Sequence, residues 1–139
     1  MKVAIDLDVL GDTRPLWRDW LEDVSRVLDV DGLPENRSGA AAELDARGAG
    51  NWRTLLERFA EDRAPVYLRP AAEVSDVLRT LQSGGAEIVV FTDAPLELAQ
   101  VALRQLGAAR RVVGVESLPP EADLVVRTRQ ELLRLRRSA

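Results

Sequence analysis

The first apolar segment of the chain, VAIDLD at residues 3–8, ends in two aspartates that are one residue apart. The segment is short and rich in β-branched residues, so it predicts a buried strand rather than a helix. Alternate residues of a strand face the same way, and Asp6 and Asp8 are therefore expected to lie side by side. Two close carboxylates repel each other unless a cation lies between them. The pair predicts a site, although an aspartate in such a turn can also be a helix cap.

Composition restricts the chemistry that such a site can perform. The 139 residues suit one domain, 1–139, and the 46% hydrophobic and 30% charged content is typical of a globular protein. Histidine and cysteine are both absent, which excludes disulfides, thiolate nucleophiles, Ser-His triads and zinc sites with nitrogen or sulfur ligands. A bound metal is therefore expected to be a hard ion held by oxygen, with Mg²⁺ first.

Charge and hydropathy indicate where the protein works and what it does not bind. The net charge of −4 argues against nucleic-acid binding. No apolar segment approaches the roughly 18 residues of a membrane span, and the N-terminus lacks the apolar core of a signal peptide. We expect a cytoplasmic protein that does not bind membranes, and the sequence leaves its oligomeric state open.

Hydrophobic periodicity predicts strands that alternate with helices. Apolar strands separated by helices indicate an α/β fold: a Rossmann-like, three-layer parallel sheet with helices on both faces. Residues 12–64 are expected to form a small helical cap insert after the first strand, followed by an extended link at 65–70. The three tryptophans are expected to pack this insert onto the core, with an oligomer interface as the alternative. Strands are predicted at 3–8, 87–91, 111–115 and 124–126, and helices at 16–28, 40–46, 52–60, 70–83, 96–106 and 128–136.

A second polar cluster follows the strand predicted at 87–91. Thr92 and Asp93 leave that strand directly before a helix, whose free amide groups can hold an anion. Ligands of parallel sheets bind at the carboxyl ends of the strands, so this cluster is expected to share a crevice with the aspartate pair. The alternative is that Thr92 and Asp93 only cap the helix.

These residues resemble a known family. VAIDLD at 3–8 with DTRPLW at 12–17, and later IVVFTDAP at 88–95, are similar to the first and second motifs of haloacid dehalogenase-like (HAD) hydrolases, which are mostly phosphatases. The segments from Tyr67 to Leu81 and from Ala122 to Leu132 resemble later parts of the same family. The resemblance covers nearly the whole chain, and it implies a HAD-like fold with a cap at 12–64.

The resemblance also implies an activity and a role for each site residue. Asp6 would be the nucleophile, forming an aspartyl-phosphate that water hydrolyses, and Asp8 would be the general acid and base. Mg²⁺ would be held by Asp6 and Asp8, while Thr92 and Asp93 would bind the phosphate. The function implied is a magnesium-dependent phosphatase of a small phosphorylated metabolite.

The chain departs from the family pattern at the third and fourth motifs. The third motif is a lysine, and Lys2, the only lysine, stands too early to supply it. Arg110 or Arg111 is expected to bind phosphate instead, although arginine has a different shape and reach. The fourth motif is an acidic pair, for which Glu116 is the candidate third metal ligand, unless it only faces solvent. We therefore expect weak activity, with a catalytically inactive binding or regulatory module as the alternative.

Overall fold

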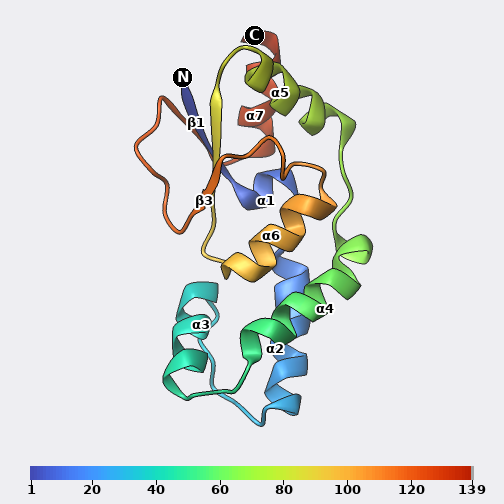
Figure 1. The fold of residues 1–139 in the computed structure, drawn as a ribbon, viewed down its shortest axis with the longest axis vertical. Helices are drawn as coiled ribbons and strands as arrows, with labels where there is room; N and C mark the ends of the chain where they lie inside the picture. The colour runs from blue at the N-terminus through green and yellow to red at the C-terminus, as the bar shows by residue number, and fades with distance from the viewer. Residues whose placement is uncertain (139) are drawn as a thin grey trace.

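Four parallel strands form the sheet in the computed structural model, which describes residues 1–138 (Figure 1). The strand order is β3-β2-β1-β4, so β1 and β2 are the two central strands. In the β1–β2 register, Lys2 is opposite Glu87 and Asp6 is opposite Phe91, which brings the carboxyl ends of these strands side by side. The strands are β1 (Lys2–Asp6), β2 (Glu87–Phe91), β3 (Gly114–Glu116) and β4 (Leu124–Val126).

Burial explains why the two central strands read as continuous apolar runs. Val3, Ala4 and Ile5 of β1 are completely buried, because both faces of a central parallel strand are covered. The edge strand β4 is more exposed, and Leu124 and Val125 each keep 36% of their surface accessible. The α/β class, the parallel sheet and the strands at 87–91 and 124–126 are confirmed.

The helices lie at both ends of the long axis of the molecule and between them, where Figure 1 shows α1 and α6. In Figure 1, α2, α3 and α4 lie at one end, and α5 and α7 lie at the other. No helix within residues 1–138 has both the length and the apolar character needed to cross a membrane. The helices are α1 (Leu7–Leu10), α2 (Arg14–Val27), α3 (Arg37–Ala46), α4 (Trp52–Tyr67), α5 (Ala72–Ser83), α6 (Leu96–Gln105) and α7 (Arg129–Ser138).

The first strand is shorter than the sequence predicts. It ends at Asp6, and residues 7–10 form the single helical turn α1 instead of continuing the strand. The Asp6 carboxylate caps this turn by accepting a hydrogen bond from the Asp8 amide at 3.0 Å. The prediction that strand alternation brings the two aspartates together is therefore wrong, and a capped turn does so instead.

Further boundaries differ from the prediction. Helix α3 begins at Arg37 rather than at residue 40, because the Asn36 side chain caps it there. Helix α4 continues to Tyr67 through Pro65, where an extended link was expected. Pro65 lies in the last turn and has no N–H to donate to the Glu61 carbonyl. Glu61 is exposed, so water can bind this carbonyl instead. The third strand begins at Gly114 rather than at residue 111, because Arg111 still belongs to the turn after α6 and donates its amide to the Ala108 carbonyl.

The three tryptophans form the centre of the helical end. Trp17, Trp20 and Trp52 are at most 4% exposed. Ring centroids are 5.0 Å apart between Trp17 and Trp20 and 5.8 Å apart between Trp20 and Trp52, so the cluster joins α2 to α4. The three tryptophans are therefore confirmed as buried core residues, whereas their packing of residues 12–64 as a cap onto the core stays a prediction.

Candidate active site

A cavity of about 810 Å³ opens at the carboxyl ends of β1 and β2. Its walls include both aspartates of the first segment and both polar residues that follow β2, which are Asp6, Asp8, Thr92 and Asp93. The parallel register of β1 and β2 explains this meeting, since residues after the two strands emerge at the same edge of the sheet. The two clusters predicted from the sequence therefore share one cavity.

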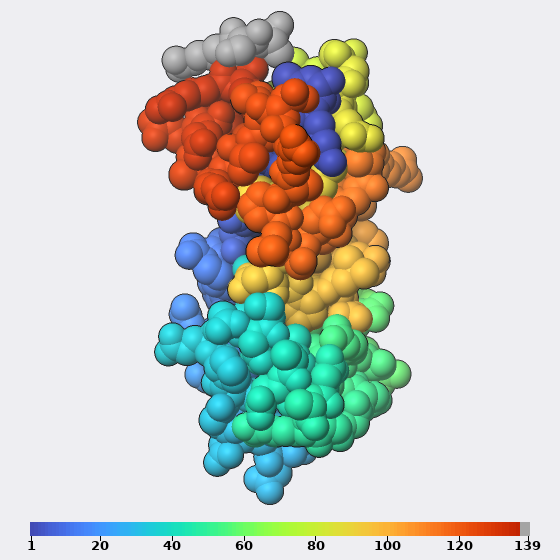
Figure 2. All heavy atoms as spheres, turned by 90° about the vertical axis from the view of Figure 1, so that its left-hand side faces the viewer, coloured from blue at the N-terminus to red at the C-terminus, as the bar shows by residue number. Residues whose placement is uncertain are grey.

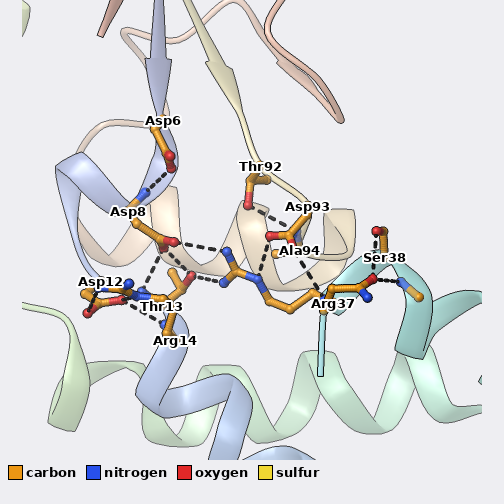
Figure 3. Close-up of polar contacts among 12 residues, drawn as sticks. Asp6, Asp8, Asp12, Thr13, Arg14, Arg37, Ser38, Thr92, Asp93 and Ala94 are labelled. Carbon is orange, nitrogen blue, oxygen red and sulfur yellow. Dashed lines mark hydrogen bonds and ion pairs between the residues drawn. The ribbon is translucent and has the colours of Figure 1, made fainter. Parts of the chain in front are cut away.

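Asp6 lies at the end of β1, and its side chain is partly buried. One carboxylate oxygen accepts the Asp8 amide, and Figure 3 shows the side chain directed toward that turn. Burial raises the pKa of Asp6 above its ordinary value. The negative charges of Asp8 and Asp93 add to this rise, while the Asp8 amide and Arg37 oppose it.

Asp8 is held by donors on both of its carboxylate oxygens. Oδ1 accepts the Thr13 amide at 3.0 Å and the Thr13 hydroxyl at 2.6 Å, and Oδ2 accepts Nη2 of Arg37 at 3.0 Å. Thr13 is completely buried, so its hydroxyl has a fixed position rather than a solvated one. These contacts fix the orientation of the Asp8 carboxylate.

Arg37, the first residue of α3, is the site residue that sequence reasoning missed. Only 9% of its side chain is exposed, and its guanidinium binds Asp8, Asp93 and the Thr13 hydroxyl (Figure 3). A positive charge in the first turn of a helix is unfavourable to the helix dipole. Asn36, a preferred N-cap residue, is the sequence signal that could have placed the helix start here, and the unfavourable position would then have indicated that Arg37 has partners elsewhere.

The two residues after β2 have different tasks. Thr92 is buried, and its hydroxyl accepts the Ala94 amide at 3.1 Å, which shapes the turn before α6. The Asp93 carboxylate accepts Nε of Arg37 at 2.8 Å and the Arg37 amide at 3.3 Å. The side chain of Asp93 therefore binds a cation from α3, and the predicted role of Asp93 in phosphate binding stays a prediction.

The remaining wall of the cavity consists of arginines, apolar side chains, Ser117 and one exposed carboxylate, that of Glu35. Arg14 donates two hydrogen bonds to Asp12, at 2.8 and 2.9 Å, and these hold the pKa of Asp12 below its ordinary value. Arg127 lies over the ring of Phe91, with 5.5 Å from its guanidinium carbon to the ring centroid. Arg18, Leu21, Leu118 and Pro119 complete this side, together with Trp17, whose buried Nε1 has no hydrogen-bond partner within residues 1–138.

Two predicted site residues do not line the cavity. Arg110 is exposed in the turn between the carboxyl end of α6 and the amino end of β3, which is the edge of the sheet opposite Asp6, and Arg111 lies beside it. Glu116 ends β3, and its carbonyl accepts the Thr92 amide at 2.9 Å. The exposed Glu116 side chain is absent from the cavity wall, which is formed by the next residues, Ser117 to Pro119.

The donor set decides what kind of magnesium site is feasible here. Within residues 1–138, no three acidic, histidine or cysteine side chains lie close enough together to hold a metal ion. The predicted set of Asp6, Asp8 and Glu116 is thus not assembled, and Asp8 is already bound by Arg37 and Thr13. Magnesium commonly uses one or two carboxylates and completes its shell with water and substrate phosphate. The residues fit a site of that shared kind, with Asp6 as the carboxylate ligand.

Comparison of this chain with protein-family models, with curated proteins and with solved structures finds no match.

Proposed function

We propose that this protein is a HAD-like phosphohydrolase that cleaves a small phosphate monoester in the cytoplasm. The observation that carries the proposal is the meeting of Asp6, Asp8 and Thr92 in one cavity at the carboxyl ends of two central parallel strands. Arginines in the same wall suit an anionic substrate. In this proposal the sheet is the middle layer of a three-layer fold, and residues 12–64 form a cap over the cavity.

Asp6 has the role of nucleophile in the proposed reaction. Its carboxylate oxygen attacks phosphorus, the bond from phosphorus to the ester oxygen breaks, and an aspartyl-phosphate forms on Asp6. The leaving oxygen takes up a proton from Asp8 in its protonated form. Asp6 and the Asp8 carbonyl would hold Mg²⁺, and the bound ion would supply charge neutralisation for the transferring group.

Asp8 has the role of general acid and base. Water loses a proton to Asp8 and attacks the aspartyl-phosphate, which releases inorganic phosphate and restores Asp6. In the observed arrangement both Asp8 oxygens accept hydrogen bonds, which suits removal of a proton from water. Donation of a proton to the leaving oxygen needs Asp8 protonated and turned from Arg37, and this requirement is consistent with weak activity.

The second candidate is a binding or regulatory module without catalysis. The contact that favours it is the ion pair between Arg37 and Asp8, which occupies the proposed acid and base with a buried cation. Such a module would retain phosphate affinity but would release no phosphate from esters.

Phosphate release from a panel of small monoesters, with and without Mg²⁺, tests the proposal. We expect magnesium-dependent release that falls by about a thousandfold or more in Asp6→Asn. Asp62→Asn is the matched control, because it makes the same change at a carboxylate that is 81% exposed on α4. Equal release by the wild type and Asp6→Asn would reject the hydrolase and leave the binding module.

A further inference from the structure

We propose that Arg37 is the residue that recognises the phosphoryl group, and that closure of α3 over the cavity and anion binding therefore favour each other. The identity of the anion rests on the proposed function. The contacts of Arg37 themselves do not depend on it.

The charge balance of the cavity gives the first argument. Four carboxylates line one cavity, those of Asp6, Asp8, Glu35 and Asp93, and Arg37 makes ion pairs with two of them, Asp8 and Asp93. An anion that approached these carboxylates without a nearby cation would be repelled, most strongly where burial excludes water. The guanidinium of Arg37 is thus the group that makes the cavity suitable for an anion.

The donor inventory of Arg37 gives the second argument. A guanidinium has five N–H groups. Three are donated to Asp93, Thr13 and Asp8 through Nε, Nη1 and Nη2, and the other two have no acceptor in the described part of the chain. Arg37 also lines the cavity. A phosphoryl group in the cavity can accept these two N–H groups while the carboxylates hold the guanidinium in place.

The other cations are less suited to this role. Lys2 begins β1 and so lies at the opposite edge of the sheet from Asp6. Arg14 binds Asp12, and 69% of its side chain is exposed. Arg127 is exposed and stacks on Phe91. Arg18 also lines the cavity and is exposed. Arg37 is therefore the buried one of the cavity arginines, and buried cations interact with anions with little screening.

The position of Arg37 links anion binding to the placement of α3. Figure 2 shows α3 lying directly against the region of α6, and the contacts of Arg37 with Asp93 cross this boundary. The buried face of α3, with Ala40 and Leu44, packs on the core independently of the cavity. The Arg37 contacts hold the amino end of α3, so an anion that strengthens them also holds α3 closed, and the effect is reciprocal.

Amide hydrogen exchange over residues 37–46, together with calorimetry of inorganic phosphate in millimolar Mg²⁺, tests the proposal. In the wild type, phosphate should slow exchange at the amino end of α3 by about fivefold or more. In Arg37→Gln this slowing should disappear, and the phosphate Kd should rise by about tenfold or more. Arg47→Gln is the matched control, because Arg47 lies at the other end of α3 and binds Glu43 and the Asp31 carbonyl.

Arg37→Lys is a second variant that keeps the proposal testable if Arg37→Gln does not fold. It keeps the positive charge but loses the planar guanidinium fork. It should weaken phosphate binding by roughly threefold or more and leave circular dichroism unchanged. Phosphate affinity and α3 protection equal to the wild type in either folded variant would overturn the proposal, as would a wild type that binds no phosphate.

The same experiments separate this proposal from the proposed function. A wild type that binds phosphate through Arg37 but hydrolyses no ester supports the role of Arg37 and rejects the hydrolase. If hydrolysis depends on Asp6 but Arg37→Gln leaves the phosphate affinity unchanged, the role of Arg37 is overturned and the proposed activity stands.

Discussion

The Asp6 carboxylate ends a buried strand where solvation is poor and two other carboxylates are near. Its raised pKa means that ionisation of Asp6 opposes folding. The folded protein binds a proton at Asp6 more tightly than the unfolded chain does. The contribution of Asp6 to stability is therefore most favourable below its unfolded pKa of 3.8 and declines as pH rises through the folded value.

Asp6→Asn should consequently stabilise the protein at neutral pH. The asparagine oxygen can still accept the Asp8 amide, so the cap of α1 is kept while the buried charge is removed. We expect a melting temperature a few degrees above the wild type at about pH 7.5, and a smaller gain at about pH 4.

Thermal denaturation of the wild type, Asp6→Asn and Asp62→Asn at both pH values measures this effect. Asp62→Asn controls for the loss of one negative charge at an exposed position. If the gain in melting temperature of Asp6→Asn did not increase with pH, the idea that ionised Asp6 lowers the stability of the folded protein would be contradicted.

At the scale of elements, α3 depends on its first turn. Asn36 is in an extended conformation, and its side chain accepts the Gly39 amide at 2.6 Å, which satisfies a free donor of the helix. Arg37 follows immediately, so this cap also fixes the start of the guanidinium side chain that enters the cavity. The local capping motif and the site are thus built from adjacent residues.

Asn36→Ala should destabilise the protein by about 1 kcal/mol, because the helix loses its side-chain cap. Asn51→Ala is the matched control, since Asn51 occupies the same position before α4 but makes no capping hydrogen bond. Urea denaturation of both variants measures the difference, and equal losses for Asn36→Ala and Asn51→Ala would show that the Asn36 cap contributes nothing.

Pro65 gives a second test at this scale. It lies inside α4 and lacks the N–H that the last turn would use, so Pro65→Ala should stabilise the protein by about 1–2 kcal/mol. Pro70→Ala changes a proline outside the helices and should give no such gain. If urea denaturation shows Pro65→Ala to be less stable than the wild type, restriction of the unfolded chain by Pro65 outweighs the missing hydrogen bond.

At the scale of the whole molecule, the site is assembled from distant parts of the chain. Asp6 and Asp8 come from the start, Arg37 from α3, and Thr92 and Asp93 from the turn after β2. The described residues supply fewer than three clustered metal ligands, so a bound phosphate would have to complete a magnesium shell.

Magnesium and phosphate should therefore bind cooperatively. We expect millimolar Mg²⁺ to tighten phosphate binding by about fivefold or more, with phosphate tightening magnesium by the same factor. Asp6→Asn should remove this coupling, because it removes the proposed carboxylate ligand. Calorimetry in both orders measures the effect, and tight magnesium binding that is independent of phosphate would contradict a shared site.

The sequence by itself determined the parallel α/β sheet and two of its strands, because buried central strands need continuous apolar residues that local pattern reveals. It also located Asp6, Asp8 and Thr92 at one edge of the sheet, since strand direction in a parallel sheet follows from the helical connections. It did not reveal that β1 ends at Asp6, because the hydrogen bond by which Asp6 caps α1 competes locally with continuation of the strand to residue 8.

Only the tertiary structure decided how the site is completed. Arg37 is 29 residues from Asp8 and 56 from Asp93, and no local pattern encodes contacts at such separations. Glu116 and Arg110 follow the expected elements, yet the packing of β3 and α6 leaves their side chains outside the cavity. The strand pattern determines that the carboxylates lie at the carboxyl ends of the strands. Side-chain packing between separate elements determines which cation binds them.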